Sequence, residues 1–167
     1  MDDNGGHPTM VAKAVELFGT HETAGDGDNP AILGWARETG LDGAYRHDET
    51  PWCGLFMAVT AKRAGKTVVA DPLWALNWAA FGTKADAASF GDVLVFKRPG
   101  GGHVGLYIAE DASYYYVLGG NESDQVEIEP ILKTRLYAAR RPHYDVQPAN
   151  VRPVQRSLGG TVIRDEA

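Results

Sequence analysis

The sequence predicts a segregated α+β domain, with helices in the N-terminal half and an antiparallel sheet of five to six strands in the C-terminal half. Two observations predict this class. Three segments combine an N-cap residue, a first-turn proline and a terminal glycine, which together mark helices: Asn29-Pro30 to Gly40, Thr50-Pro51 to Gly65, and Asp71-Pro72 to Gly82. From Ala85 onward, the hydrophobic residues alternate with period two, as they do in strands.

A further helix is expected over residues 10–18, where apolar side chains share one face and Gly19 ends the element. Strands are expected at residues 91–96, 103–109, 114–118, 125–129 and 134–140. The connections between the first three strands are short, so these strands should form an antiparallel meander.

One domain is expected over residues 9–142, after a flexible arm at residues 1–8. Residues 143–167 contain several helix and strand breakers and no sustained periodicity, which indicates a loosely packed or disordered extension. The alternative is that apolar residues of this extension dock on the domain: Val151, Val154, Leu158, Val162 and Ile163.

The composition is that of an ordinary globular protein, and 167 residues can bury a full core unaided, so a monomer is expected. The net charge of -6 and the lack of a basic stripe argue against nucleic-acid binding. No run of 18 apolar residues occurs, which argues against membrane insertion. With one cysteine, neither an internal disulfide nor a cysteine-rich metal site can form, and we expect no metal ion and no cofactor.

Cys53 is the only cysteine and a candidate nucleophile. With Thr50 as the N-cap and Pro51 as the first helical residue, Cys53 falls at the third helical position. There the backbone N–H groups and the helix dipole favour the thiolate, which is the reactive form. A buried core cysteine is the alternative, and the position alone does not separate the two.

His103 has the strongest context for a base among the five histidines. It follows the turn-forming residues 98–102, Arg-Pro-Gly-Gly-Gly, and opens a predicted strand. If the next hairpin turns through residues 111–113, Glu110 pairs with Tyr114 and His103 lies opposite Asn121. Facing residues of antiparallel strands have Cβ atoms about 5 Å apart, so the Asn121 amide could orient the imidazole. A turn residue is the alternative for Asn121.

Four ordered motifs resemble those of bacterial and phage cell-wall hydrolases of the CHAP and NlpC/P60 type. They are Thr50-Pro51-Trp52-Cys53, Gly91-Asp92-Val93-Leu94-Val95-Phe96, Gly102-His103-Val104-Gly105 and Leu118-Gly119-Gly120-Asn121. The chain is more closely similar to a small phage-associated subfamily with a PWC helix, a GGHVG strand and a GGN turn. The similarity spans about residues 9–142. Gly54 departs from it, because a small residue such as alanine or serine is expected there.

The resemblance implies a papain-like fold whose N-terminal helices carry Cys53 and whose sheet carries His103. It implies that Cys53 attacks a peptidoglycan amide, that His103 is the base and that Asn121 orients it. The domain at residues 9–142 is then catalytic, and its partner is the stem peptide of peptidoglycan. An endopeptidase that cuts within the stem peptide and an amidase that cuts between sugar and peptide fit equally. We expect a phage-type endolysin.

The hypothesis from another class is a non-catalytic virion or effector module that binds wall fragments on the same fold. The joint presence of Cys53, His103 and Asn121 argues against it. The first seven residues do not resemble a signal peptide. We therefore expect synthesis in the cytoplasm, in a phage-infected host, and action on the cell wall after external release.

Three further residues are candidates for contacting the substrate. Trp52 either walls the pocket beside Cys53 or anchors the helix. Tyr115 shares strand parity with Asn121. Glu49 could bind a substrate amine, with a solvated loop residue as the alternative. The remaining tryptophans are expected in the core: Trp35, Trp74 and Trp78.

Overall fold

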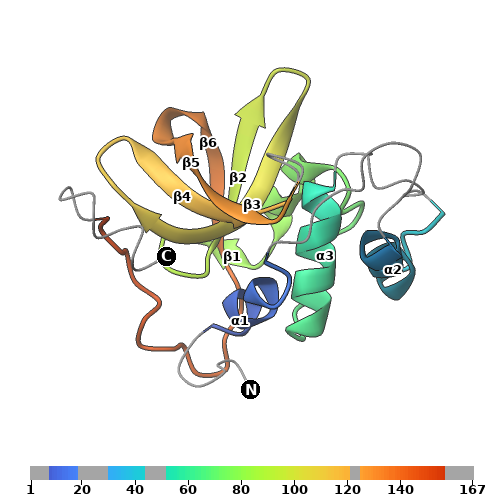
Figure 1. Ribbon diagram of the computed structural model, residues 1–167. Helices are drawn as coiled ribbons and strands as arrows, with labels where there is room; N and C mark the ends of the chain where they lie inside the picture. Colours follow the sequence, from blue (N-terminus) through green and yellow to red (C-terminus); the bar gives the residue numbers. More distant parts are fainter. Residues whose placement is uncertain (1–7, 19–29, 44–51, 121–124, 157–167) are drawn as a thin grey trace.

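The computed structural model describes residues 8–18, 30–43, 52–120 and 125–156, and in them the α-helices lie beside a single sheet (Figure 1). The helices are α1 (Thr9–Val15), α2 (Pro30–Thr39) and α3 (Cys53–Arg63), with 3-10 helices η1 (Ala75–Ala80) and η2 (Lys133–Arg135). The strands are β1 (Thr83–Lys84), β2 (Val93–Arg98), β3 (Gly101–Glu110), β4 (Tyr114–Gly119), β5 (Glu127–Leu132) and β6 (Leu136–Arg141). The predicted α+β class is confirmed.

The sheet has six strands in the order β1-β6-β2-β3-β4-β5, and every neighbouring pair is antiparallel. Strands β2 to β5 follow one another as a meander, which confirms the predicted connectivity. Strand β6 returns to the free edge of β2, and the short β1, which the sequence pattern does not predict, pairs outside β6.

The helix that carries Cys53 begins later than the sequence predicts. Trp52 is its N-cap and Cys53 its first residue, and the Phe56 N–H donates to the Trp52 carbonyl oxygen at 2.8 Å. The expected capping residues, Thr50 and Pro51, lie outside the described residues. Cys53 therefore stands at the first helical position instead of the third, still within the turn whose N–H groups make no bond inside the helix.

The segment expected to form a helix from Asp71 to Gly82 folds differently. Only Ala75–Ala80 is helical, as the 3-10 helix η1, and Asp71 before it has a φ of 48°. The Asp71 carbonyl accepts hydrogen bonds from the Trp74 N–H at 3.2 Å and from the Asn77 side-chain amide at 2.9 Å. The Trp78 indole N–H donates to the Pro72 carbonyl at 2.9 Å. These bonds fold residues 71–74 against η1 and replace a regular first turn.

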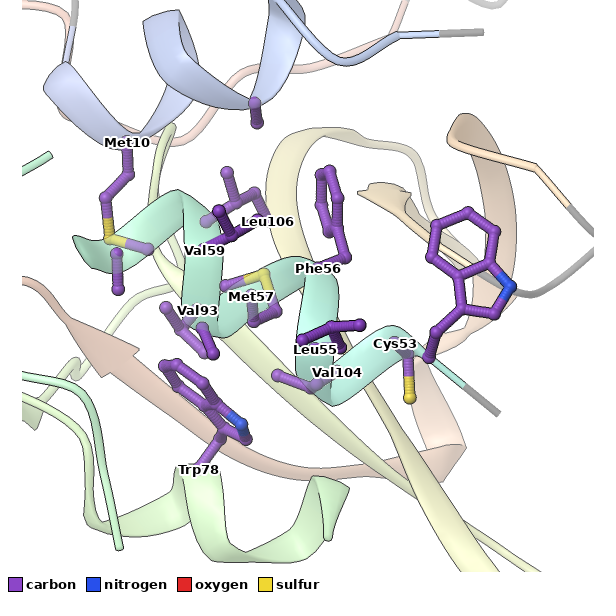
Figure 2. Close-up of a cluster of buried hydrophobic side chains, with 14 of the residues drawn as sticks. Met10, Cys53, Leu55, Phe56, Met57, Val59, Trp78, Val93, Val104 and Leu106 are labelled. Carbon is purple, nitrogen blue, oxygen red and sulfur yellow. The ribbon is translucent and has the colours of Figure 1, made fainter. Parts of the chain in front are cut away.

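Hydrophobic side chains are buried on both faces of β2 and β3. The main core lies between the sheet and the helices, and Figure 2 shows the α3 side chains Leu55, Phe56, Met57 and Val59 beside Val93, Val104 and Leu106 of the sheet. A second cluster covers the opposite face: Leu94, Phe96, Tyr107, Val117 and Ile131. Burial on both faces explains why β2 begins with a continuous apolar run instead of an alternating one.

A buried ion pair joins the start of β2 to the end of β6. The Asp92 carboxylate is fully buried and accepts from Arg141 Nε at 2.9 Å and from Arg141 Nη2 at 2.8 Å. It also accepts from the Ser89 N–H at 2.8 Å. Three donors therefore compensate the desolvation of one carboxylate and tie together strands that are distant in sequence.

Part of the extension after β6 packs against the sheet, whereas residues 145–147 are exposed. The Glu110 N–H donates to the Val154 carbonyl at 2.8 Å, and the Phe90 N–H donates to the Arg152 carbonyl at 3.0 Å. Val151 is buried, and Val154 packs against the second cluster. Main-chain hydrogen bonds and these two valines therefore hold residues 151–156 against the sheet. Residues 157–167 lie outside the described part.

No helix of the described residues is long and apolar enough to cross a membrane.

Candidate active site

Cys53 lines a cavity of about 300 Å³ at the N-terminal end of α3. Leu73, Trp74 and Ala75 form one wall, and residues 98–102 of the β2–β3 hairpin form the other. The Cys53 residue is only 4% exposed, and its sulfur atom points away from the helix (Figure 2). The thiol is therefore nearly buried, as the alternative of a core cysteine requires, and it also lines a cavity, as a nucleophile requires.

Because Gly54 has no side chain, the cavity wall can approach α3 closely. The main chain of Pro72 and Leu73 occupies the space where a side chain at position 54 would stand. The resemblance predicts alanine or serine at position 54. The glycine found there instead leaves room for the main chain of the cavity wall. The segment that follows, Leu73 to Ala75, is the one that walls the cavity.

His103 lies near the start of β3 and is 3% exposed. It pairs with Phe96 across the β2–β3 hairpin, and the two rings stack with centroids 6.5 Å apart. The imidazole therefore lies on the sheet face of the second hydrophobic cluster. There it lines a cavity of about 180 Å³ together with Arg98, Arg135 and residues of β5. Arg98 belongs to the walls of both this cavity and the Cys53 cavity.

The surroundings of His103 favour its neutral form. Burial, with a smaller effect of the Arg98 and Arg135 cations, lowers the pKa of His103 from 6.5 to about 3. Loss of hydration and nearby positive charge both disfavour an imidazolium. The ring is therefore neutral at pH 7, the form that can accept a proton, but a pKa of about 3 makes it a weak base in this environment.

The structure does not bring Cys53 and His103 into one cavity: they lie on opposite faces of the sheet, and the Cys53 end of α3 and the His103 ring reach the same end of β4 from its two sides. His103 Nε2 lies 3.1 Å from the position that a Cβ on Gly119 would take. Trp52, the neighbour of Cys53, has its ring atom Cζ3 2.6 Å from the corresponding position on Gly120. Because Gly119 and Gly120 have no side chains, the His103 and Trp52 rings can both pack directly against this end of β4. This end of β4 leads directly into Asn121.

The pairing of β3 with β4 keeps the predicted register next to His103 and changes it farther away. Leu106 pairs with Leu118, as the prediction requires, but an irregularity after Tyr107 shifts the register. Glu110 consequently pairs with Tyr115 instead of Tyr114. The turn itself is as expected, and the Asp111 carboxylate accepts from the N–H groups of the two residues that close it. Asn121 and Glu49 lie outside the described residues.

Trp52 and Tyr115 pack within the protein and line neither cavity. Trp52 is fully buried, with its ring centroid 5.8 Å from that of Trp35 on α2. Of the two roles that the sequence leaves open for Trp52, its packing is that of an anchor for α3. Tyr115 is half-buried and contacts Phe96 at 6.3 Å between ring centroids. It shares a sheet face with His103, not with Cys53.

Trp74 is the cavity residue that the sequence pattern misses. It was expected in the core with Trp78, four residues later, but it is 51% exposed while Trp78 is fully buried. The reason is local geometry: residues 71–74 do not form a regular helical turn, so the two indoles do not share a helix face. The only sequence signal was the Asp71-Pro72 dipeptide, which marks a turn as well as a helix start.

No three histidine, cysteine or acidic side chains within the described ranges come close enough to hold a metal ion.

No protein-family model matches the chain, and no curated protein sequence is significantly similar to it.

Proposed function

We propose that this protein is a cysteine hydrolase that cleaves amide bonds of bacterial cell-wall peptidoglycan on a papain-like fold, as a phage-type endolysin does. The observation that carries the proposal is the position of the single cysteine. Cys53 is the first residue of α3, and it lines a cavity of about 300 Å³ although its side chain is almost buried. The resemblance of the four sequence motifs to CHAP and NlpC/P60-type hydrolases supplies the substrate class.

In the proposed reaction, His103 is the base that the resemblance implies: its ring must reach the Cys53 cavity from the opposite face of the sheet and take the proton of Cys53, and the thiolate then adds to the amide carbonyl carbon. The carbon–nitrogen bond breaks, the leaving amine takes the proton from His103, and water hydrolyses the resulting thioester. Because burial disfavours the imidazolium, this proton transfer depends on the negative charge that develops on sulfur in the same step. Asn121 is the proposed orienting group for His103.

The Cys53 backbone N–H is the proposed donor to the oxyanion that forms during attack. It belongs to the first residue of α3, at the positive end of the helix dipole. A donor of this kind typically contributes about 3 kcal/mol to lowering the barrier of acyl transfer.

Digestion of purified peptidoglycan tests the proposal. The wild-type protein should release soluble fragments, and Cys53→Ala and Cys53→Ser should release none while unfolding at the same temperature. Mass spectrometry of the fragments identifies the bond: new amino termini on stem peptides mean an endopeptidase, and free lactyl ends on the sugars mean an amidase. Full lysis by Cys53→Ala would overturn the proposal, and absence of products from the wild type would favour the non-catalytic wall-binding module.

Alkylation of the thiol provides a second, independent test. Cys53 is the only cysteine, so iodoacetamide can modify one site only, and the Cys53→Ala protein is the matched control. If the helix terminus favours the thiolate, alkylation and loss of lysis should proceed in parallel below pH 7.5. Alkylation with the pH profile of an ordinary thiol, with a pKa of about 8.5, would count against an activated nucleophile.

A further inference from the structure

Trp74 is exposed in a protein that buries its other tryptophans. Trp35, Trp52 and Trp78 are buried, whereas Trp74 is 51% exposed. An indole is a large apolar group with one polar N–H, and when it stays at the surface of a concave region it commonly contacts a ligand. Exposure of one apolar side chain is not by itself evidence of a binding site, so the residues around the Trp74 ring must be considered.

Trp74 lines two cavities. On one side is the Cys53 cavity, of about 300 Å³. On the other is a cavity of about 400 Å³ lined by Leu41, Asp71, Pro72, Leu73 and Trp74. Trp74 and Leu73 belong to both. The benzene edge of the indole stands against the β2–β3 hairpin, with Cη2 3.8 Å from the position of a Cβ on Gly101. The Trp74 ring therefore lines both cavities, and its benzene edge is packed against the β2–β3 hairpin.

The two cavities differ in charge. The cavity beyond Trp74 is largely apolar and has a single ionisable residue, Asp71. The Cys53 cavity has Arg98 in its wall instead. An exposed aromatic face with a carboxylate beside it matches a sugar, whose C–H face can stack on the indole while its hydroxyl and amide N–H groups donate to the carboxylate. A cation beside the nucleophile matches a peptide that carries carboxylates.

We propose that Trp74 is a sugar-stacking platform and that the cavity bounded by Leu41, Asp71 and Trp74 takes the amino sugar of the substrate. This inference rests on the proposed function and deepens it. Because Leu73 and Trp74 line both the sugar cavity and the Cys53 cavity, a sugar bound here would present the first bond after it to the thiol. The protein is then an amidase that cuts between the lactyl group of the sugar and the first amino acid of the stem peptide.

The cleavage step follows from this placement. The Cys53 thiolate adds to the lactyl carbonyl carbon, and the bond from that carbon to the amino-acid nitrogen breaks. The nitrogen takes a proton from His103 and leaves as the free amine of the stem peptide. Water then hydrolyses the thioester, which yields a lactyl carboxylate and restores the thiol.

Fluorescence quenching tests the platform without relying on activity. Since the other three tryptophans are buried, iodide should quench chiefly Trp74 emission, and Trp74→Phe should lose the quenchable component. In the Cys53→Ala protein, a disaccharide–stem-peptide fragment and the disaccharide alone should each protect Trp74 from iodide at millimolar concentration. The free stem peptide, which would reach only the Cys53 side of the ring, should protect Trp74 less than the disaccharide does. Equal protection by the free peptide, or no protection by either sugar-containing fragment, would overturn the sugar site.

Kinetics on two substrates provide the second test. Trp74→Ala should lower kcat/KM on the disaccharide–stem-peptide fragment at least about tenfold, mainly through KM, and Trp74→Phe should retain most activity. Tyr137→Ala is the matched control, because Tyr137 is a half-exposed aromatic residue on β6 that lines neither cavity. It should leave kcat/KM unchanged. An equal loss with Tyr137→Ala would show that the effect is not specific to Trp74.

The two proposals fail in different ways. If wild-type protein releases new amino termini from within stem peptides, the cysteine hydrolase stands and the amidase assignment falls. If Cys53→Ala keeps full lytic activity, the proposed function falls, whereas protection of Trp74 by the disaccharide would still establish the sugar site.

Discussion

Gly54 and Pro72 are in backbone contact: a Cβ on Gly54 would stand 2.1 Å from the Pro72 carbonyl oxygen. That oxygen is not free to move, because it accepts the buried indole N–H of Trp78 at 2.9 Å. The contact joins the residue after the candidate nucleophile to the segment that walls its cavity. A side chain at position 54 would therefore have to displace main chain that is held from the other side.

Gly54→Ala should accordingly destabilise the protein and lower its activity. Overpacking of this kind costs about 1–3 kcal/mol of unfolding free energy, and the displaced segment carries Leu73 and Trp74. Guanidinium unfolding and kcat/KM on peptidoglycan fragments measure the two effects. Gly43→Ala is the control, since a Cβ there would meet nothing within 4 Å. A Gly54→Ala protein as stable and active as Gly43→Ala would contradict the contact.

The buried imidazole of His103 should make the protein sensitive to acid. Its pKa is about 3 in the folded protein and near 6.5 in the unfolded chain, so between these values the unfolded chain binds more protons. The contribution of His103 to the free energy of unfolding is therefore fully present above pH 6.5 and is lost as the pH falls toward 3. By linkage, lowering the pH to 4.5 should cost about 2–3 kcal/mol.

Replacing His103 with glutamine removes this titration and supplies the control. The variant is expected to have lower stability at pH 7, but the slope of its unfolding free energy between pH 6.5 and pH 4.5 should be shallower than that of the wild type. The slope, not the absolute stability, is the measured quantity, because other acidic groups contribute equally to both proteins. Parallel slopes would mean that His103 is not held neutral by burial.

Removing one partner of the Asp92–Arg141 pair should cost more stability than removing one partner of an exposed pair. Asp92→Asn leaves a guanidinium without its carboxylate partner and should cost about 3 kcal/mol or more, because one partner of a buried pair is lost. The control is Glu38→Gln, whose pair with Arg63 at 2.8 Å is about one-third exposed on both sides and should cost less than about 1 kcal/mol. Similar midpoints of denaturant unfolding for the two variants would refute this ranking.

The orienting role of Asn121 stays a prediction from sequence, and kinetics can test it. An uncharged amide can fix the imidazole but stabilises an imidazolium less than a carboxylate does, so Asn121→Ala should lower turnover by about one to three orders of magnitude. His103→Ala should abolish turnover. Asn121→Asp should keep partial activity and raise the pKa of His103. Full activity of Asn121→Ala beside an inactive His103→Ala would leave Asn121 as a turn residue only.

Local sequence signals are sufficient to predict the type and the order of most helices and strands. The proline at the start and the glycine at the end of α2 act through the adjacent main chain, and Gly40 has a φ of 76° just after the helix ends. Period-two alternation likewise predicts β3 and β4 to within one or two residues. These signals operate over a few residues, so no knowledge of the packed structure is needed to interpret them.

Long-range contacts decide the features that matter for the site. The exposure of Trp74 depends on how residues 71–74 fold against η1, and the space beside Gly54 is filled by main chain that lies 18 residues away in sequence. The neutral state of His103 depends on burial and on Arg135, which is contributed by η2 after β5. The sequence by itself determined the class of fold, the meander and which cysteine and histidine to consider. Only tertiary packing could decide their exposure and charge, because both quantities are sums over neighbours that the chain brings together from distant positions.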